Sequence, residues 1–236
     1  MEKNINDNDD IIKKNIDFFS LNKKYQNNIA TIDTYKILYS EITNVIKFSN
    51  NLLDIGHGGS FDYDTSKIKS ITGLDLDKMI DGSVLPKNIT LREGSVLDIP
   101  DDIKNFDTTL VVMLLHHLVG KKVSENLENL DKSLNQIHKT LASDGKLVIV
   151  ESCVPKWFYF IEKILYKPSA ILIKKFMKHP PAFQFTEEIL INYLHKNNYK
   201  NINIKKIKQG KFILQYGVKF PTFLTPVETV IITANK

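Results

Sequence analysis

Short apolar runs recur along the first two thirds of the chain, and each run ends at a glycine or a polar residue. They occupy residues 52–55, 71–74, 89–92, 109–113 and 146–150. Runs of four to five apolar residues that are bounded in this way are typical of buried strands in a parallel sheet. We therefore expect five such strands before residue 151.

Helical spacing of apolar residues appears between and around these runs. Residues 11–48 and 123–141 show it, and the sequence from Thr186 to Glu188 caps a third helix. Strands that alternate with helices predict a parallel sheet with right-handed crossovers. After residue 180 the order changes, because the capped helix is followed by strand-like stretches at 202–207, 212–216 and 227–234. We expect the last two to form a hairpin-like pair.

Composition sets the broad class of the protein. The 236 residues are 42% hydrophobic and 25% charged, which is usual for a globular protein, and Cys153 is the only cysteine. No apolar window reaches the length of about 18 residues that a membrane span needs, and the polar N-terminus does not look like a secretory signal. We expect a single α/β domain in a reducing, cytoplasmic compartment.

The net charge of +5 leaves a nucleic-acid partner open. Lysines accompany many asparagines and isoleucines, so a solvated basic surface is the simpler interpretation. The charge is uneven, however, because residues 151–180 carry six lysines and two glutamates, a local balance of 6 − 2 = +4.

Four sequence motifs follow the predicted strands in order. A glycine cluster at residues 53–59 follows the first strand, and 73–77 ends the second strand in acidic residues. Residues 94–100 follow the third strand, and 115–118 follow the fourth. Asp75 lies nineteen residues after Gly56, close to the spacing of about 20 at which a carboxylate meets ribose hydroxyls in dinucleotide-binding folds.

These motifs together resemble those of class I S-adenosylmethionine (SAM)-dependent methyltransferases, over most of residues 50–236. The resemblance implies an α/β, Rossmann-like, doubly wound fold. Its mostly parallel, seven-stranded sheet would end with an antiparallel C-terminal strand and carry helices on both faces. It also implies SAM as cofactor, with no metal. The expected cofactor-binding residues are Asp54, Gly56, His57, Gly58, Asp75, Leu76, Val96, Leu97, Asp98 and Met113.

Physical reasons support several of these assignments. Glycine allows the main chain to approach a ligand closely, and open α/β sheets bind ligands at the carboxyl ends of their strands. Asp98 can accept from the adenine amino group, and Asp54 from the first-motif backbone or the methionine ammonium. The chain departs from these methyltransferases at two positions. A small residue is usual where this chain has His57, and a third glycine is usual where it has Ser60. The connections after the first two strands are also short.

Two histidines after the fourth strand are candidate catalytic bases. His117 and His116 lie where the methyl group should point, and imidazole titrates near neutral pH. We favour His117 slightly; the alternative is that one histidine caps backbone groups while the other packs beneath the cofactor. An amine or carbon acceptor would need no base.

The sequence also suggests how the chain is divided. Residues 1–49 would form a helical segment that packs on the methyltransferase domain at 50–236. Within that domain, 154–181 would be an insertion rich in aromatic residues and lysine. We expect the insertion to cover a hydrophobic acceptor; ordinary core packing and transient contact with a membrane surface are the alternatives.

Three functions remain open at this point. The first is methylation of a small, apolar or aromatic molecule. The second is a nucleic-acid or protein methyltransferase, with nucleic acid disfavoured because the residues after the fourth strand differ from those of adenine methyltransferases. The third is a SAM-binding protein that does not methylate.

Overall fold

The computed structural model describes residues 31–77, 85–176, 180–215 and 218–236, with side chains at all of these except 167 and 169–176. The sequence predicted a helical segment over residues 11–48. The part of this segment before residue 31 lies outside the described residues. The first helix described is α3, over Asp33–Ile46.

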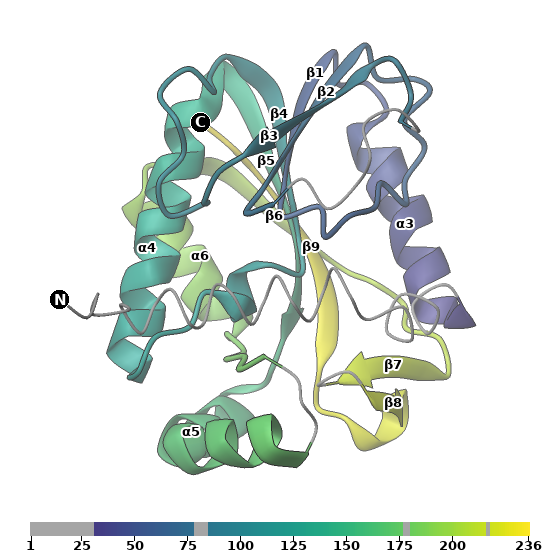
Figure 1. Cartoon of the computed structure of the whole chain (residues 1–236). Helices are drawn as coiled ribbons and strands as arrows, with labels where there is room; N and C mark the ends of the chain where they lie inside the picture. The colour runs from purple at the N-terminus through teal and green to yellow at the C-terminus, as the bar shows by residue number, and fades with distance from the viewer. Residues whose placement is uncertain (1–30, 78–84, 177–179, 216–217) are drawn as a thin grey trace, which may run out of the picture.

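The remaining elements follow the predicted order closely (Figure 1). The strands are β1 (Asn51–Ile55), β2 (Ser70–Asp75), β3 (Ile89–Glu93), β4 (Phe106–Val112), β5 (Leu141–Cys153), β6 (Lys200–Lys206), β7 (Phe212–Gln215), β8 (Val218–Pro221) and β9 (Glu228–Asn235). The helices are α4 (Val123–Thr140), α5 (Lys156–Phe176) and α6 (Glu187–Lys196), with short 3-10 turns η2 (Leu115–His117) and η3 (Thr222–Leu224).

Seven strands form one sheet in the order β3-β2-β1-β4-β5-β9-β6. Strands β1 to β5 pair in parallel, whereas β9 runs antiparallel to both β5 and β6. The predicted α/β fold with an antiparallel C-terminal strand is therefore confirmed.

The pairing predicted for the last two strands is wrong. β7 pairs with β8 in a separate two-stranded sheet, and β9 inserts between β5 and β6. The burial of the strands explains the difference. Residues 230–232 of β9 are all buried, which suits a strand covered on both faces, whereas Phe212 in β7 is exposed.

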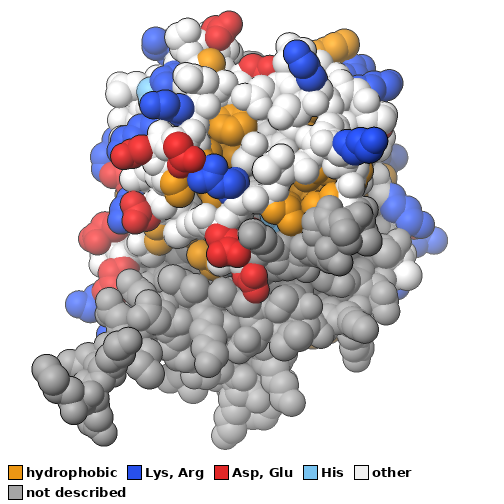
Figure 2. Space-filling view, turned by 45° about the horizontal axis from the view of Figure 1, so that its top comes forward, with side chains coloured by type: hydrophobic (Ala, Val, Ile, Leu, Met, Phe, Trp, Pro, Cys, Tyr) orange, Lys and Arg blue, Asp and Glu red, His pale blue; other side chains and the backbone are white. Residues whose placement is uncertain are grey.

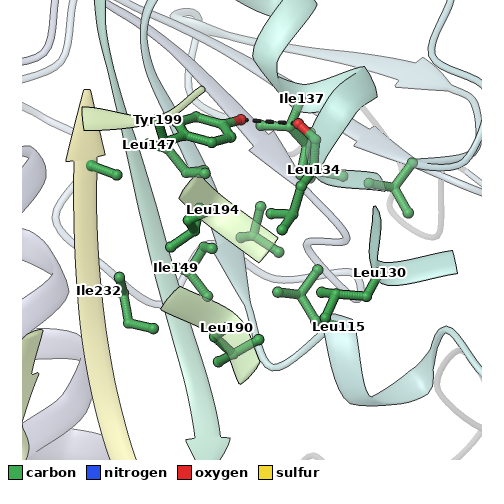
Figure 3. Close-up of a cluster of buried hydrophobic side chains, with 14 of the residues drawn as sticks. Leu115, Leu130, Leu134, Ile137, Leu147, Ile149, Leu190, Leu194, Tyr199 and Ile232 are labelled. Carbon is green, nitrogen blue, oxygen red and sulfur yellow. Dashed lines mark hydrogen bonds between the residues drawn. The ribbon is translucent and has the colours of Figure 1, made fainter. Parts of the chain in front are cut away.

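Alternate residues of the central strands enter two different hydrophobic cores. Leu147 and Ile149 of β5 pack in the cluster shared with α4 and α6, while Val148 and Val150 pack in the cluster shared with α3. Figure 3 shows the first cluster, where the Tyr199 hydroxyl donates to the Leu134 carbonyl at 3.1 Å. Helices thus cover both faces of the sheet, as predicted.

The connection from β1 to β2 contains no helix. Residues 56–69 form turns, and the side chain of Asn88 fixes them by donating to the carbonyls of Thr65 and Ile68. Tyr63 and Ile68 from this connection are buried with α3 in the second core. The short interval after the first motif is therefore a packed loop, and α3 supplies the helical cover on that side.

Basic and acidic side chains alternate over much of the described surface. Lys196 pairs with Asp131 at 2.7 Å, and Lys205 pairs with Glu41 at 2.6 Å. Figure 2 shows blue and red side chains interleaved over the described part of one face. Several lysines of the described surface thus have an acidic partner.

Candidate functional site

Three left-handed glycines shape the loop after β1. Gly56, Gly58 and Gly59 have φ values of 75°, 58° and 86°, which residues with a Cβ rarely adopt. A Cβ on Gly56 would lie 2.9 Å from the Leu114 side chain, so this glycine also permits close packing against the end of β4. A Cβ on Gly58 would meet nothing within 4 Å. The backbone at Gly58 therefore borders open space.

Asp75 joins this loop to the end of β2. Its side chain accepts from the Gly58 amide at 2.9 Å through Oδ2 and from the Leu76 amide at 2.7 Å through Oδ1. The residue is 8% exposed. Each carboxylate oxygen has two lone pairs, so each retains one for a further donor such as a hydroxyl group.

Asp54 is buried within β1, behind the glycine loop. The hydroxyl of Tyr63 donates to its Oδ2 at 2.8 Å. Burial raises the pKa of Asp54 from 3.8 to about 7; the Tyr63 hydrogen bond opposes this shift, and the nearby charge of Asp75 adds to it. Asp54 therefore changes its charge near neutral pH, and a cation placed beside it would favour the ionised form.

His57 packs inward, where a small residue is usual in the family. Its ring stacks on Phe61, with centroids 5.0 Å apart, and its Nδ1 accepts from the Gly59 amide at 3.1 Å. Burial lowers the pKa of His57 and so favours the neutral ring, whose proton lies on Nε2 when Nδ1 accepts from the Gly59 amide. Among the described residues this buried Nε2 has no partner. Gly73 in β2 accommodates the stacked pair, because a Cβ there would lie 2.8 Å from the Phe61 ring.

The loop after β3 forms a tight turn. The Asp98 amide donates to the Ser95 carbonyl at 2.9 Å, and the Leu97 amide donates to the Ser95 hydroxyl at 3.2 Å. Val96 is buried, whereas Asp98 is exposed. The Leu97 amide thus has a partner inside the turn. The Asp98 carboxylate faces solvent.

A histidine–carboxylate pair lies at the ends of β4 and β5. Nδ1 of His116 lies 2.5 Å from Oε1 of Glu151, and the His116 amide donates to Oε2 at 3.3 Å. Glu151 is completely buried, and the Ser152 amide also donates to its Oε1, at 2.8 Å. The His116 side chain keeps 13% of its surface exposed. His117 is buried, with its ring centroid 4.1 Å from that of His116.

Further polar residues extend this pair toward α5. The side-chain amide of Gln184 donates to the Ser152 hydroxyl at 3.2 Å, and its backbone amide donates to Glu162 of α5 at 3.2 Å. None of these four residues, Glu151, Ser152, Gln184 and Glu162, was predicted as a site residue from the sequence. A signal was available for Glu151, because a glutamate directly after a buried apolar strand run needs a buried partner.

Met113 connects the two parts of this edge. It ends β4 with a φ of 51°, and its amide donates to the Val150 carbonyl at 2.8 Å. The next residue, Leu114, packs on Gly56. The structure thus places the predicted residues of the β1, β2 and β4 ends along one edge of the sheet. Among the described residues, no group of three or more His, Cys, Asp and Glu side chains could hold a metal ion.

A glycine loop beside a strand-end carboxylate, on a sheet of this order, is typical of nucleotide-binding α/β proteins. No protein-family model matches the chain. A curated demethylmenaquinone methyltransferase from Lactobacillus johnsonii is 27% identical over an alignment of 160 residues, which covers 62% of this chain and 61% of that protein. The chain therefore matches less than two thirds of this relative's length.

Solved structures show the same fold. A SAM-dependent methyltransferase from Methanosarcina mazei matches 84% of this chain and 97% of its own, with a TM-score of 0.52 and 15% identity. The N-methyltransferase NodS from Bradyrhizobium japonicum, solved with S-adenosyl-L-homocysteine, matches 86% of this chain and 85% of its own, with a TM-score of 0.54 and 14% identity. The chain thus has the fold of SAM-dependent methyltransferases, the family that its four motifs resemble.

Proposed function

We propose that the protein transfers a methyl group from SAM to a small, apolar or aromatic acceptor that carries a hydroxyl group. The observation that carries this proposal is the His116–Glu151 pair, which lies next to the glycine loop through the contact of Leu114 with Gly56. The similarity to a demethylmenaquinone methyltransferase supports an acceptor with a large apolar part.

The residues of the glycine loop and of the neighbouring strand ends fit SAM. The open backbone at Gly58 allows close approach, and Asp75 has lone pairs free for the two ribose hydroxyls. Asp98 is exposed at the adenine side, and Asp54 can balance the methionine ammonium. The buried Nε2 of His57 offers a donor in the same loop. Bound SAM would supply a methyl group on a positively charged sulfur, already activated for transfer.

His116 would act on the acceptor. Because Nδ1 faces Glu151, the carboxylate fixes the tautomer that keeps the proton on Nδ1 and leaves Nε2 free to accept one. The acceptor hydroxyl would give its proton to Nε2 as its oxygen bonds to the methyl carbon and the carbon–sulfur bond breaks. Glu151 would stabilise the imidazolium that results. A positioned base of this kind contributes about 10²- to 10⁴-fold.

The inner side of α5 would close the acceptor site. Glu162 ties this helix to Gln184, and Gln184 continues to Ser152 beside the base pair. Tyr159 and Tyr166 of the same helix pack edge-on against Phe183, with centroids 5.4 Å away in each case. The segment 154–181 would thus present aromatic rings and a few polar groups, the lining expected around a small apolar molecule.

The pairing of lysines with carboxylates on α6 and β6 argues against nucleic acid as acceptor on that part of the surface. A nucleic-acid site needs a continuous basic stripe, whereas the described lysines of α6 and β6 pair with nearby carboxylates. The proposal can be tested by titrating the protein with SAM in a calorimeter. Radiolabelled SAM should then label hydroxylated isoprenoid and aromatic compounds. SAM binding with no product from this panel or from a cell lipid extract would favour the non-methylating alternative.

A further inference from the structure

Helix α5 has two sides that differ sharply. On its inner side, Glu162 and Tyr166 are buried, and the Tyr166 hydroxyl donates to the Gly120 carbonyl at 2.7 Å. On its outer side, large apolar side chains recur at helical spacing and are exposed to solvent; Trp157 is 60% exposed and Ile164 is 62% exposed. We define the α5 outer face as Trp157, Phe160, Ile161, Ile164 and Leu165.

The hairpin of β7 and β8 packs beside α5. Ile213 of β7 belongs to a small buried cluster against which Phe158 and Tyr159 of α5 pack. Figure 1 shows the helix and the hairpin together at the lower end of the molecule, toward which β5 runs. The hairpin and the turn after it add further exposed apolar side chains, namely Val218, Phe220, Phe223 and Leu224. Exposed apolar area is thus concentrated at this end.

The sequence of these segments is rich in lysine, although Lys156 of α5 pairs with Glu188 of α6. Residues 154–181 contain six lysines and a single acidic residue, Glu162, whose side chain is turned inward. Residues 208–227 contain three lysines and no acidic residue. Lys219 in β8 lies over the ring of Phe212, 4.5 Å from its centroid. Aliphatic stems that lie along apolar surface while the charges stay in water are suited to a lipid–water interface.

We propose that the α5 outer face and the tip of the β7–β8 hairpin dock on an anionic lipid surface. A helix with an apolar outer side and lysines beside it can lie in the plane of the headgroups. No helix among the described residues is long and apolar enough to cross a bilayer. A second copy of the chain fits this surface less well, because a two-fold contact would bring the same lysines of both copies together.

Docking in this orientation would place the candidate acceptor site next to the lipid. The outer side of α5 would touch the headgroups, while Glu162 on its inner side contacts Gln184 and, through it, Ser152. An acceptor dissolved in the bilayer could then reach His116 without crossing water. This consequence rests on the proposed function, but the docking itself does not.

Sedimentation of the full chain with lipid vesicles tests the docking without any enzyme assay. We expect binding to vesicles of phosphatidylcholine with phosphatidylglycerol. Vesicles of phosphatidylcholine alone should bind more weakly, by about fivefold for each lysine that lies near the anionic surface. Trp157 is the only tryptophan in the chain, so its fluorescence reports this face directly. Its emission should shift to shorter wavelength with anionic vesicles.

Two matched variants localise the contact. Phe160→Ser removes an aromatic side chain from the α5 outer face and should weaken vesicle binding about tenfold or more. Phe48→Ser removes another exposed phenylalanine, 84% exposed against 62% for Phe160, which lies between α3 and the start of β1, and it should leave binding unchanged. Both side chains are exposed, so both variants should fold.

Three results would overturn the proposal. One is the absence of sedimentation with either type of vesicle, and another is an equal loss of binding in Phe160→Ser and Phe48→Ser. The third is a dimer in analytical ultracentrifugation that Phe160→Ser dissociates, which would assign the face to a second copy of the chain. Loss of methyl transfer with vesicle binding intact would instead count against the proposed function alone.

Discussion

The two halves of the sheet edge are built from different chemical groups. In the β1–β2 half, main-chain groups dominate: three left-handed glycines form the loop, and Asp75 holds it through the Gly58 amide. In the β4–β5 half, buried side chains dominate: His116 meets Glu151, and Ser152, Gln184 and Glu162 continue the chain of hydrogen bonds. The first half offers a surface for close approach of a ligand, and the second offers a positioned ring nitrogen.

The two halves are therefore suited to two different tasks, holding a cofactor and orienting an acceptor. A cofactor shared by a large class of enzymes can be held by backbone groups, whose geometry depends little on the surrounding side chains. An acceptor specific to one enzyme needs particular side chains whose orientation is fixed by buried partners. Changes in one half should therefore alter cofactor affinity, and changes in the other should alter turnover.

The largest expected effect comes from the side-chain half. His116→Ala should lower kcat about 10²- to 10⁴-fold and leave SAM affinity unchanged, because the base acts on the acceptor. Single-turnover transfer of a radiolabelled methyl group, combined with SAM calorimetry, measures both quantities.

The neighbouring histidine provides the control for this experiment. His117→Ala should reduce kcat much less, since His116, whose ring contacts Glu151, is the residue that we propose as the base. A large loss in His117→Ala with full turnover in His116→Ala would reverse this assignment. It would also restore the slight preference for His117 that the sequence suggested.

A smaller effect is expected on the free energy of unfolding, from a substitution of Asp54 in the β1–β2 half. Burial raises the pKa of Asp54 to about 7, so the folded state favours its protonated form. That contribution to stability is complete below about pH 4 and is lost as the pH rises through 7. Asp54→Asn cannot ionise, so it should be more stable than the wild type at pH 8, by about 2–4 kcal/mol.

Urea unfolding of both proteins at pH 4.5 and pH 8 measures this difference. The advantage of Asp54→Asn should shrink strongly at the lower pH. Asp98→Asn, at an exposed position, should show no such pH dependence. A constant difference at both pH values would mean that Asp54 does not titrate between them.

The backbone half was largely predictable from the sequence, because its residues lie in contiguous motifs. Gly56 and Gly58 fall in one short segment, and Asp75 ends a clear apolar strand. The sheet was predictable for a similar reason, since each central strand is a separate apolar run. The pairing of β9 was not, because apolar alternation does not specify which neighbour a strand will choose.

The side-chain half could not be assembled from the sequence alone. Glu151 and Gln184 are separated from His116 by 35 and 68 residues (151 − 116 and 184 − 116), and neither belongs to a local motif. Only the tertiary fold brings them together, through the pairing of β4 with β5 and the return of the chain after α5. The two histidines were identified, but the partner that distinguishes them was not.

A further test of the backbone half concerns Asp75. Asp75→Ala removes the carboxylate that holds the Gly58 amide and that we propose accepts from the ribose. SAM should bind about 10- to 150-fold more weakly, which corresponds to about 1.5–3 kcal/mol for a hydrogen bond to a charged group. Calorimetry with SAM measures the loss, and circular dichroism confirms folding. Unchanged affinity in the folded variant would remove Asp75 from the cofactor site.

The smallest expected effect is at Asp98, because this residue of the proposed cofactor site has an exposed side chain. Asp98→Ala should weaken SAM about two- to tenfold, or about 0.5–1.5 kcal/mol, since water competes for a hydrogen bond at an exposed carboxylate. The turn itself should survive, because the Asp98 amide still donates to the Ser95 carbonyl. A ligand that lacks the adenine base should bind the variant and the wild type equally. Equal losses for SAM and for that ligand would show that Asp98 acts on the loop as a whole and not on the adenine.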